Sequence, residues 1–357
     1  MDYIFGGIFM KMMAARLYGP KDLRWIEIDI PQLKENDVLI HVKYCGVCGT
    51  DQAIYSGESS FWEAGLIHTP MTLGHEYSGI ISEVGKNVTS VKIGDRVVSD
   101  TVVSCGVCDQ CKQGNYPFCS KLRAVGTINT YDGGYAEYSV MPERHVFILP
   151  DNITFEQGAL VEPVATGLWA VKMGDIKIGD NVVIIGTGAI GLGAVPFAAL
   201  SGAKKVIIVG RKDFKLEIGK KFGADDSINT TKEDVYERVM ELTKGKGADV
   251  IIEASGSLDM LKEAIRMSSN GCRISCVAFY EKPVEKLNLD SIIIRNISLL
   301  PVGGCHNMMP IVIKMMECGK VDFTPMITQI MPLRDAEKAL NDLKINSASR
   351  VKILLKV

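Results

Sequence analysis

Four cysteines lie close together in the first half of the chain, at a spacing that suits metal binding. The pattern is Cys105-x2-Cys108-x2-Cys111-x7-Cys119. Four thiolates supplied by one loop complete a tetrahedral zinc site and leave no position open for a substrate, so this pattern predicts a structural zinc. A redox-active or disulfide cluster is the alternative. It is less favoured because we recognise no export signal in the sequence.

A second set of possible metal ligands is dispersed along the chain. It comprises Gly46-Val-Cys48-Gly-Thr50-Asp51, Gly74-His75-Glu76 and Glu162-Pro163. A thiolate, an imidazole and a carboxylate can bind zinc with one position open, as Lewis-acid catalysis requires. Each residue also has a simpler explanation. Cys45 and Cys48 would suit a redox pair, His75 a hydrogen-bonded core histidine, and Glu162 the start of a helix. Their joint occurrence favours a catalytic zinc.

A glycine-rich hexapeptide predicts a dinucleotide site. It is Gly186-Thr187-Gly188-Ala189-Ile190-Gly191. It lies between an apolar stretch at Val182–Ile185, which predicts a strand, and helical spacing at Ala189–Ser201. In this context the first two glycines allow a tight turn and a close approach to the pyrophosphate, and the third allows close helix packing. The alternative is a tight strand–helix turn that binds nothing.

The choice between NAD and NADP depends on the residue that ends the next predicted strand, Val206–Val209. An acidic side chain there would bind the ribose 2′-hydroxyl of NAD. The sequence instead has Gly210-Arg211-Lys212, which offers two cations and no carboxylate. This favours NADP over NAD. The alternative is that the two cations are solvated and that Asp213 reaches back to the ribose.

The elements around these motifs predict an α/β protein of two domains. The first half is β-rich, with predicted strands at Val38–Tyr44, Gly79–Val84 and Val97–Val103 and turns at Gly94-Asp95 and Gly133-Gly134. From Gly179 short strands alternate with helices, which predicts a doubly wound parallel sheet. Its further strands are Val250–Ile252 and Arg273–Val277, with helices at Lys232–Leu242 and Leu258–Met267. After an irregular stretch, a helix at Asp335–Leu343 and a strand at Val351–Leu355 end the chain. We therefore expect a dinucleotide-binding domain over 166–304, inserted into a catalytic domain formed by 1–165 and 305–357.

Composition excludes several classes of partner. The 357 residues include 40 basic and 42 acidic side chains, so there is no electrostatic reason to expect nucleic acid or an anionic membrane as partner. No apolar stretch is long enough to span a bilayer. Met1–Met13 has neither a basic start nor a cleavage site, and we interpret it as an extension or the product of an upstream start codon, not as a signal peptide. These features predict a cytoplasmic protein, in which the scattered Cys272, Cys276, Cys305 and Cys318 are small buried hydrophobic residues.

Together these motifs resemble the zinc-containing medium-chain dehydrogenases, in particular the sorbitol, butanediol and threonine dehydrogenase branch. The resemblance rests on G-V-C-G-T-D at 46–51, L-G-H-E at 73–76, G-D-R-V at 94–97, the four cysteines, V-E-P at 161–163 and G-T-G-A-I-G at 186–191. It implies a GroES-like catalytic domain, two zinc ions per chain and a homo-oligomer, either a dimer or a tetramer. It also implies that Cys48, His75 and Glu76 bind the catalytic zinc, and that Glu162 is either an exchangeable fourth ligand or the partner of the zinc-bound water. Asp51 would then orient His75.

The resemblance implies oxidation of an alcohol to a carbonyl compound, with Thr50 taking the hydroxyl proton. Two features depart from the polyol-oxidising relatives. Ala53 stands where a proton-relay histidine is common, and Gly303-Gly304-Cys305 lies where an arginine often enters the pocket. We therefore expect a secondary alcohol such as a cyclitol or a sugar derivative, held near Phe61-Trp62-Glu63 and Leu66-Ile67-His68. The alternatives are a zinc-free quinone or enoyl reductase of the same fold and a non-catalytic dinucleotide-binding protein.

Overall fold

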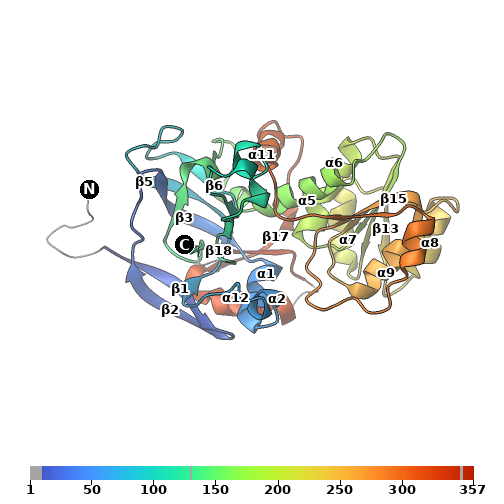
Figure 1. The fold of residues 1–357 in the computed structure, drawn as a ribbon, viewed down its shortest axis with the longest axis horizontal. Coiled ribbons are helices and arrows are strands. Elements are labelled where there is room, and N and C mark those ends of the chain that lie inside the picture. Colours follow the sequence, from blue (N-terminus) through green and yellow to red (C-terminus); the bar gives the residue numbers. More distant parts are fainter. Residues whose placement is uncertain (1–9, 129–130, 346–348) are drawn as a thin grey trace. The chain divides into compact units, whose positions relative to one another are not determined.

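The computed structural model describes residues 10–128, 131–345 and 349–357. The chain forms two compact units, shown in Figure 1. Unit 1 comprises Met1–Glu162 with Met309–Val357, and unit 2 comprises Pro163–Met308. These boundaries lie three and four residues from the expected ones, and unit 2 is inserted into unit 1. No helix among the described residues has the length and apolar character needed to cross a membrane.

Unit 1 is built on a large, mainly antiparallel sheet. Its strands follow the order β10-β6-β5-β3-β18-β17, and β9 pairs with β3. Their bounds are Asp37–Gly46 (β3), Glu76–Val84 (β5), Arg96–Ser99 (β6), Tyr138–Pro142 (β9), Val146–Ile148 (β10), Ile327–Pro332 (β17) and Lys352–Lys356 (β18). Strand β18 lies antiparallel to β3, with Leu354 opposite Gly46. The last strand of the chain therefore reaches the segment that carries Cys48.

Two smaller sheets and six α-helices complete the described part of unit 1, together with short 3-10 turns. The small sheets are β2-β1-β4 and β7-β8, with bounds Lys11–Gly19 (β1), Asp22–Asp29 (β2), Met71–Thr72 (β4), Val102–Val103 (β7) and Arg123–Ala124 (β8). The helices are Gly49–Ser56 (α1), Ser60–Glu63 (α2), Asp109–Lys112 (α3), Phe155–Gly158 (α4), Met309–Glu317 (α11) and Ala336–Ile345 (α12). Helices α1 and α12 pack together, and the Tyr55 hydroxyl on α1 donates to Glu337 on α12 at 2.7 Å. Tyr55 stands in the last turn of α1, so this contact anchors the C-terminal end of the helix that Cys48 caps at its start.

Three local predictions for unit 1 are wrong. Val97–Val103 is not one strand, because β6 and β7 belong to different sheets. Gly133 and Gly134 do not form a turn, since their N–H groups donate to the carbonyls of Thr72 and Gly74. A Cβ at Gly133 would lie only 2.1 Å from the Gly74 oxygen, so glycine is needed for this close pairing. Lys11–Met13 is part of β1 rather than an extension. Residues 1–9 of the predicted extension lie outside the described residues.

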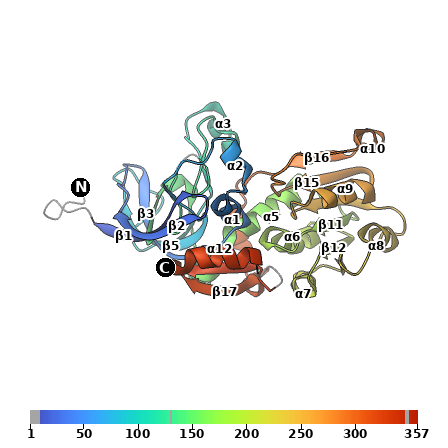
Figure 2. The same ribbon diagram turned by 90° about the horizontal axis from the view of Figure 1, so that it is seen from below.

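Unit 2 has the predicted doubly wound architecture. A six-stranded parallel sheet has the order β13-β12-β11-β14-β15-β16. The strands are Asn181–Ile185 (β11), Lys205–Gly210 (β12), Asp226–Asn229 (β13), Ala248–Glu253 (β14), Ser268–Cys276 (β15) and Ser298–Pro301 (β16). The helices are Val161–Met173 (α5), Ala189–Leu200 (α6), Asp213–Lys221 (α7), Val235–Leu242 (α8), Leu258–Met267 (α9) and Leu289–Ile294 (α10), several of which are labelled beside the sheet in Figure 2. The strand order reverses between β11 and β14, where such folds bind ligands.

Candidate active site and metal centres

The four clustered cysteines converge, as their spacing predicts. Their sulfur atoms lie within 4.8 Å of one another. The Cys108 and Cys111 sulfurs are 3.5 Å apart, and both Cys105–Cys111 and Cys108–Cys119 are separated by 3.9 Å. Sulfurs bound tetrahedrally to zinc at about 2.3 Å would lie about 3.8 Å apart. All ten cysteines are free of disulfides, so the lobe fits a closed tetrahedral metal site better than an oxidised cluster.

Backbone N–H groups in this lobe point at the sulfurs. Cys108 N donates to the Cys105 sulfur at 3.4 Å, and Lys121 N donates to the Cys119 sulfur at 3.3 Å. Donors of this kind lower the pKa of Cys105, and they lower that of Cys108 to about 6. Burial raises the pKa of Cys111 to about 11. The loop thus stabilises the thiolates of Cys105 and Cys108, and a bound dication would supply the charge needed to ionise Cys111.

A second convergence brings together three of the dispersed residues. Ligand atoms of Cys48, His75 and Glu76 lie within 4.8 Å of one another. Cys48 is the N-cap residue of α1, and Glu76 is the first residue of β5. His75 and Glu76 are buried, whereas Cys48 is partly exposed. One soft and two harder ligands therefore meet at a point that is accessible to solvent on the Cys48 side. These three ligands are the donor set expected for a catalytic zinc.

Asp51 connects the segments that carry these ligands. Its carboxylate accepts from the N–H groups of Cys48 at 3.0 Å and of Gly74 at 3.2 Å, and from the Tyr135 hydroxyl at 3.1 Å. Its Oδ1 also lies 3.3 Å from His75 Nδ1, a buried nitrogen that has no other polar partner among the described residues. The fully buried Asp51 thus fixes the position of Cys48 and His75 relative to each other, as the resemblance implies for a residue that orients His75.

Two glycines of the sequence motifs are required by this packing. A Cβ at Gly46 would lie 2.1 Å from Oε2 of Glu76. At Gly74, which has φ +91°, a Cβ would lie 2.8 Å from the Cys45 sulfur. Cys45 is itself completely buried, and burial raises the pKa of its thiol well above the ordinary value. Cys45 therefore fills the core, and the alternative of a reactive Cys45–Cys48 pair has no support in its surroundings.

Sequence reasoning missed a fourth charged group in this cluster, Lys352 on β18. Its Nζ donates to Glu76 Oε1 at 2.7 Å and Oε2 at 2.6 Å, and to the carbonyl of Val47 at 3.2 Å. Both charged side chains are buried. The available signal was a lysine within the apolar run Val351–Leu355, but only the antiparallel pairing of β18 with β3 brings it to Glu76.

Glu162 joins the same group of charges. It is the second residue of α5 and is buried, and it accepts a hydrogen bond from the Thr101 hydroxyl at 2.7 Å. Burial raises the pKa of Glu162 to about 7; His75 opposes this rise, and Glu76 reinforces it. Thr50 lies in the first turn of α1, between Cys48 and Asp51, and is partly exposed. All six predicted catalytic residues therefore belong to unit 1.

The charge balance of this cluster favours a bound cation. Cys48, Asp51, Glu76 and Glu162 are potentially anionic, and Lys352 is the cation bonded to the cluster. Burial alone would lower the pKa of His75, but Asp51 and Cys48 together raise it well above the ordinary value. The negative charges that hold a proton on His75 this strongly would also stabilise a bound dication. The residues present therefore fit zinc.

The glycine turn of unit 2 has the geometry that a dinucleotide needs. Gly186 has φ +110°, and its N–H donates to the carbonyl of Val209 at 2.9 Å. A Cβ at Gly191 would lie 2.0 Å from the Gly186 oxygen, so the helix must pack directly on the turn. Gly188 caps α6, and no atom lies within 4 Å of the position its Cβ would take. The helix N-terminus is therefore open to a phosphate group.

Cations gather at the end of β12. Gly210 ends the strand, and Arg211 and Lys212 follow as exposed residues. Lys215, on α7, is a third cation that sequence reasoning missed. Burial, together with the charges of Arg211 and Lys212, lowers the pKa of Lys215 to about 8. No salt bridge to any of the three is found among the described residues.

Asp213 does not reach back to the ribose site. Its two carboxylate oxygens accept hydrogen bonds from Asn229 at 2.7 Å and from Lys232 at 2.6 Å. Its neighbourhood therefore gives little support to the alternative in which Asp213 binds an NAD ribose.

The structure also shows what surrounds the residues proposed to line the substrate pocket and the scattered cysteines. Phe61 and Trp62, proposed to line the substrate pocket, pack against the core of unit 1, and the Trp62 indole donates to the carbonyl of Ile54 at 2.9 Å. Of the scattered cysteines, Cys272 and Cys305 are buried, as expected, whereas Cys276 is only partly buried. Cys318 is exposed, so the prediction that it is buried is wrong.

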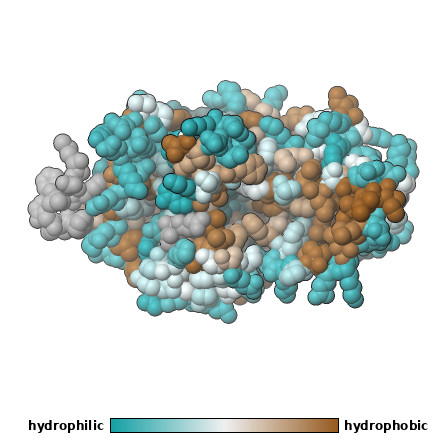
Figure 3. Space-filling model, in the orientation of Figure 1, coloured by the Kyte–Doolittle hydropathy of each residue, from teal (hydrophilic) through white to brown (hydrophobic). Residues whose placement is uncertain are grey.

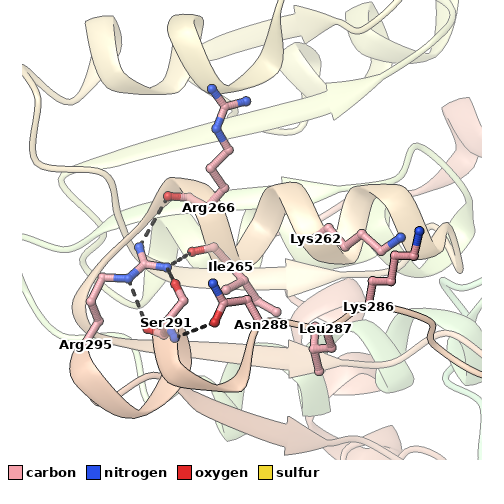
Figure 4. Close-up of a pocket in the computed structure, with 8 residues that line it drawn as sticks. All are labelled: Lys262, Ile265, Arg266, Lys286, Leu287, Asn288, Ser291 and Arg295. Carbon is pink, nitrogen blue, oxygen red and sulfur yellow. Dashed lines mark hydrogen bonds between the residues drawn. The ribbon is translucent and has the colours of Figure 1, made fainter.

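An open pocket of about 420 Å³ in unit 2 contains none of the predicted site residues. Four basic side chains line it, as Figure 4 shows: Lys262, Arg266, Lys286 and Arg295. Arg295 bonds to the carbonyls of Ile265 and Arg266 and so holds the end of α9. Arg266 pairs with Glu263 and covers the ring of Tyr236. Arg295 and Arg266 therefore have structural partners.

Known protein families match segments in both units of the chain. Residues 34–151 match the family of alcohol dehydrogenase GroES-like domains, and residues 189–317 match the zinc-binding dehydrogenase family. The chain is 34% identical to an L-threonine 3-dehydrogenase of Bacillus velezensis, covering 91% of this chain and 93% of that protein. It is 31% identical to a D-arabitol-phosphate dehydrogenase of Enterococcus avium, covering 97% of both.

Two solved structures share the whole fold. One is a putative zinc-binding dehydrogenase of Sinorhizobium meliloti bound to NADP, with a TM-score of 0.89, 30% identity and coverage of 98% of this chain and 100% of that chain. The other is an Escherichia coli protein described as a short chain alcohol dehydrogenase, in complex with NADH, with a TM-score of 0.88, 30% identity and coverage of 97% and 99%. The two-unit fold with its convergent ligand sets, the family matches and these relatives together show that this chain belongs to the zinc-containing medium-chain alcohol dehydrogenases.

Proposed function

We propose that this oxidoreductase oxidises a secondary alcohol of the polyol, cyclitol or sugar-derived class, using NADP and two zinc ions per chain. The observation that carries the proposal is the convergence of Cys48, His75 and Glu76 on one partly accessible point of unit 1. A zinc-free quinone or enoyl reductase would not need this donor set.

In this proposal Cys48, His75 and Glu76 hold the catalytic zinc, and Glu162 is the exchangeable fourth ligand. Cys105, Cys108, Cys111 and Cys119 hold the structural zinc. Bound zinc supplies Lewis-acid polarisation of the alcohol oxygen, and the bound nicotinamide accepts the hydride from the carbinol carbon. Asp51 keeps His75 and the N-terminus of α1 in place through its bonds to Cys48 N and Gly74 N.

Thr50 takes the proton that leaves the substrate hydroxyl. It stands in the first turn of α1, two residues from Cys48, and its partial exposure leaves a route for the proton to solvent. Ala53, one turn further along α1, has no ionisable group, so the proton passes from Thr50 to solvent without a histidine relay. The products are a ketone, NADPH and one proton, which balances the two electrons and two hydrogens that leave the alcohol.

The preference for NADP is supported by the three cations after β12 and by the position of Asp213. Arg211, Lys212 and Lys215 offer positive charge to a 2′-phosphate, and Asp213 is occupied by Asn229 and Lys232. The NADP-bound and NADH-bound neighbours show that the shared fold accommodates either dinucleotide.

The substrate class is supported by the relatives, which include a dehydrogenase of threonine and one of arabitol phosphate. Both named substrates carry a secondary hydroxyl group. The free thiols support our proposal of a reducing, cytoplasmic location.

We also propose that the chain forms a homo-oligomer through unit 2, either a dimer or part of a tetramer. Strand β16 is at the edge of the sheet, and within the described part of the chain it pairs only with β15. Large apolar side chains are exposed beside it, with Ile293 at 69% and Ile294 at 79% exposure on α10. Figure 3 shows apolar surface on this part of unit 2. A second copy that pairs its own β16 with this edge would cover both the strand and the apolar residues.

A metal analysis combined with a substrate panel tests the function. We expect about two zinc ions per chain and NADP reduction by secondary polyols, cyclitols or sugar derivatives, with a higher kcat/KM for NADP than for NAD. Thr50→Val should keep both zinc ions and lower kcat strongly. Absence of zinc would instead favour the reductase of the same fold. Full zinc content without activity on any alcohol would favour a non-catalytic protein.

A further inference from the structure

The side chain of Thr187 fills the space beside Gly210. A Cβ at position 210 would lie 2.6 Å from Cγ2 and 3.0 Å from Oγ1 of Thr187, and 3.4 Å from a methyl group of Leu216. Real Cβ atoms do not approach other atoms this closely, so any residue other than glycine at 210 requires Thr187 to move. Thr187 is 8% exposed and therefore surrounded by protein on most sides.

The turn that carries Thr187 is fixed on both sides. Gly186 N bonds to the carbonyl of Val209, the residue immediately before Gly210. On the other side, a Cβ at Gly186 would lie 2.8 Å from the carbonyl of Ala254, so the turn already touches the end of β14. The threonine side chain is also β-branched and has few rotamers. Thr187 is therefore held against Gly210 by the turn itself.

Position 210 is where a carboxylate would select NAD. A dinucleotide-binding sheet recognises the ribose 2′-hydroxyl with an acidic residue at the end of its second strand, and that residue also repels a 2′-phosphate. We infer that Thr187 restricts position 210 to glycine, and so keeps it free of the carboxylate that would favour NAD, because its side chain occupies the volume that an acidic side chain at 210 would need. No carboxylate at position 210 then competes for the cations Arg211, Lys212 and Lys215. This inference rests on the proposed use of NADP and explains how the glycine turn enforces it.

A double-mutant cycle on the zinc-loaded enzyme tests the inference. The variants are Thr187→Ala, Gly210→Asp and the two together, with kcat/KM and the dissociation constant measured for both NAD and NADP. Gly210→Asp alone should lose NADP activity without gaining NAD activity, because the new side chain cannot take its place. In the double variant we expect kcat/KM for NAD to rise about tenfold above that of Gly210→Asp, the coupling typical of residues in contact.

A second cycle isolates packing from charge. Gly210→Ala adds only the Cβ, and we expect it to lower the melting temperature in the presence of Thr187 and to have little effect in the presence of Thr187→Ala. This cycle also serves if Gly210→Asp fails to fold. Additive effects in both cycles would overturn the role of Thr187. A wild-type enzyme that prefers NAD, combined with strong coupling in the alanine cycle, would instead refute the proposed cofactor while confirming the contact.

Discussion

Lys352 Nζ donates to both carboxylate oxygens of Glu76, at 2.7 and 2.6 Å, and the two side chains are 4% and 1% exposed. The lysine belongs to the last strand of the chain and the glutamate to the proposed catalytic zinc cluster. A buried ion pair of this kind is costly to break, because removal of one partner leaves an uncompensated charge in the interior. The C-terminal strand therefore has a chemical as well as a structural part in the site.

Replacement of Lys352 should destabilise unit 1. We expect Lys352→Met to lower the free energy of unfolding of the zinc-free protein by about 3–5 kcal/mol, because Glu76 loses its cation. Chemical denaturation of the metal-free protein measures this change. The matched control is Glu76→Gln combined with Lys352→Met, which removes both charges and should recover most of the loss. A loss below about 1 kcal/mol in the single variant would contradict the importance of the pair.

Asp51→Asn should weaken the catalytic site while leaving the cysteine lobe intact. The amide keeps the size of the side chain, but Cys48 N and Gly74 N donate to different oxygens of Asp51, so one of them would face an NH2 donor instead of an acceptor. We expect a loss of about 10–100-fold in zinc affinity or in kcat/KM, the range found for residues that orient metal ligands. Retention of one zinc per chain serves as the internal control. Unchanged zinc affinity and turnover would show that Asp51 has no orienting role.

The cysteine lobe should account for the second zinc. Cys111→Ser removes one of four convergent sulfurs, and we expect zinc content to fall from about two to about one per chain with a lower melting temperature, since structural zinc contributes to folding. Cys318→Ser is the control, because this exposed cysteine lies outside both ligand sets. Equal zinc content in the two variants would rule out the lobe as a zinc site.

NADP binding should weaken at alkaline pH, whereas NAD binding should not. The pKa of Lys215 is lowered to about 8 by burial and by Arg211 and Lys212, so its charge is present below pH 8 and is lost above it. Because only the charged amine attracts a 2′-phosphate, the ratio of the NADP and NAD dissociation constants should rise as the pH passes through 8. Titration calorimetry between pH 7 and about 9.5 measures this ratio. Lys215→Met should remove the pH dependence, and a parallel change for both dinucleotides would exclude Lys215 as its source.

The exposed face of α10 should control assembly. We expect Ile294→Asp to shift the protein towards monomers, because it places a charge in the apolar surface beside β16. Light scattering coupled to size exclusion gives the mass in solution. Ile178→Asp is the matched control, since Ile178 is 92% exposed and lies outside α10 and β16. The proposed interface would be wrong if both variants kept the wild-type mass.

Local spacing alone was sufficient for several features of this protein. The Cys105–Cys119 lobe and the Gly186–Gly191 turn are contained in short segments, so the spacing of their residues was enough to predict their local geometry. Strands such as β11 and β14 were predictable because a strand buried on both faces is a short, continuous apolar run. Strands β13 and β16 were missed because they are short, edge strands with mixed or exposed residues.

Only the tertiary structure decided how distant residues meet. Lys352 lies 276 residues after Glu76, and no local pattern encodes the pairing of β18 with β3 that joins them. The contact between Thr187 and Gly210 likewise depends on the spacing of two parallel strands, and the close pairing of Gly133 with Gly74 replaced a predicted turn. The sequence alone determined which chemical groups are available and how each short segment folds. The distances between these groups depend on how the segments pack and pair with one another, and that is decided by contacts between residues far apart in the sequence.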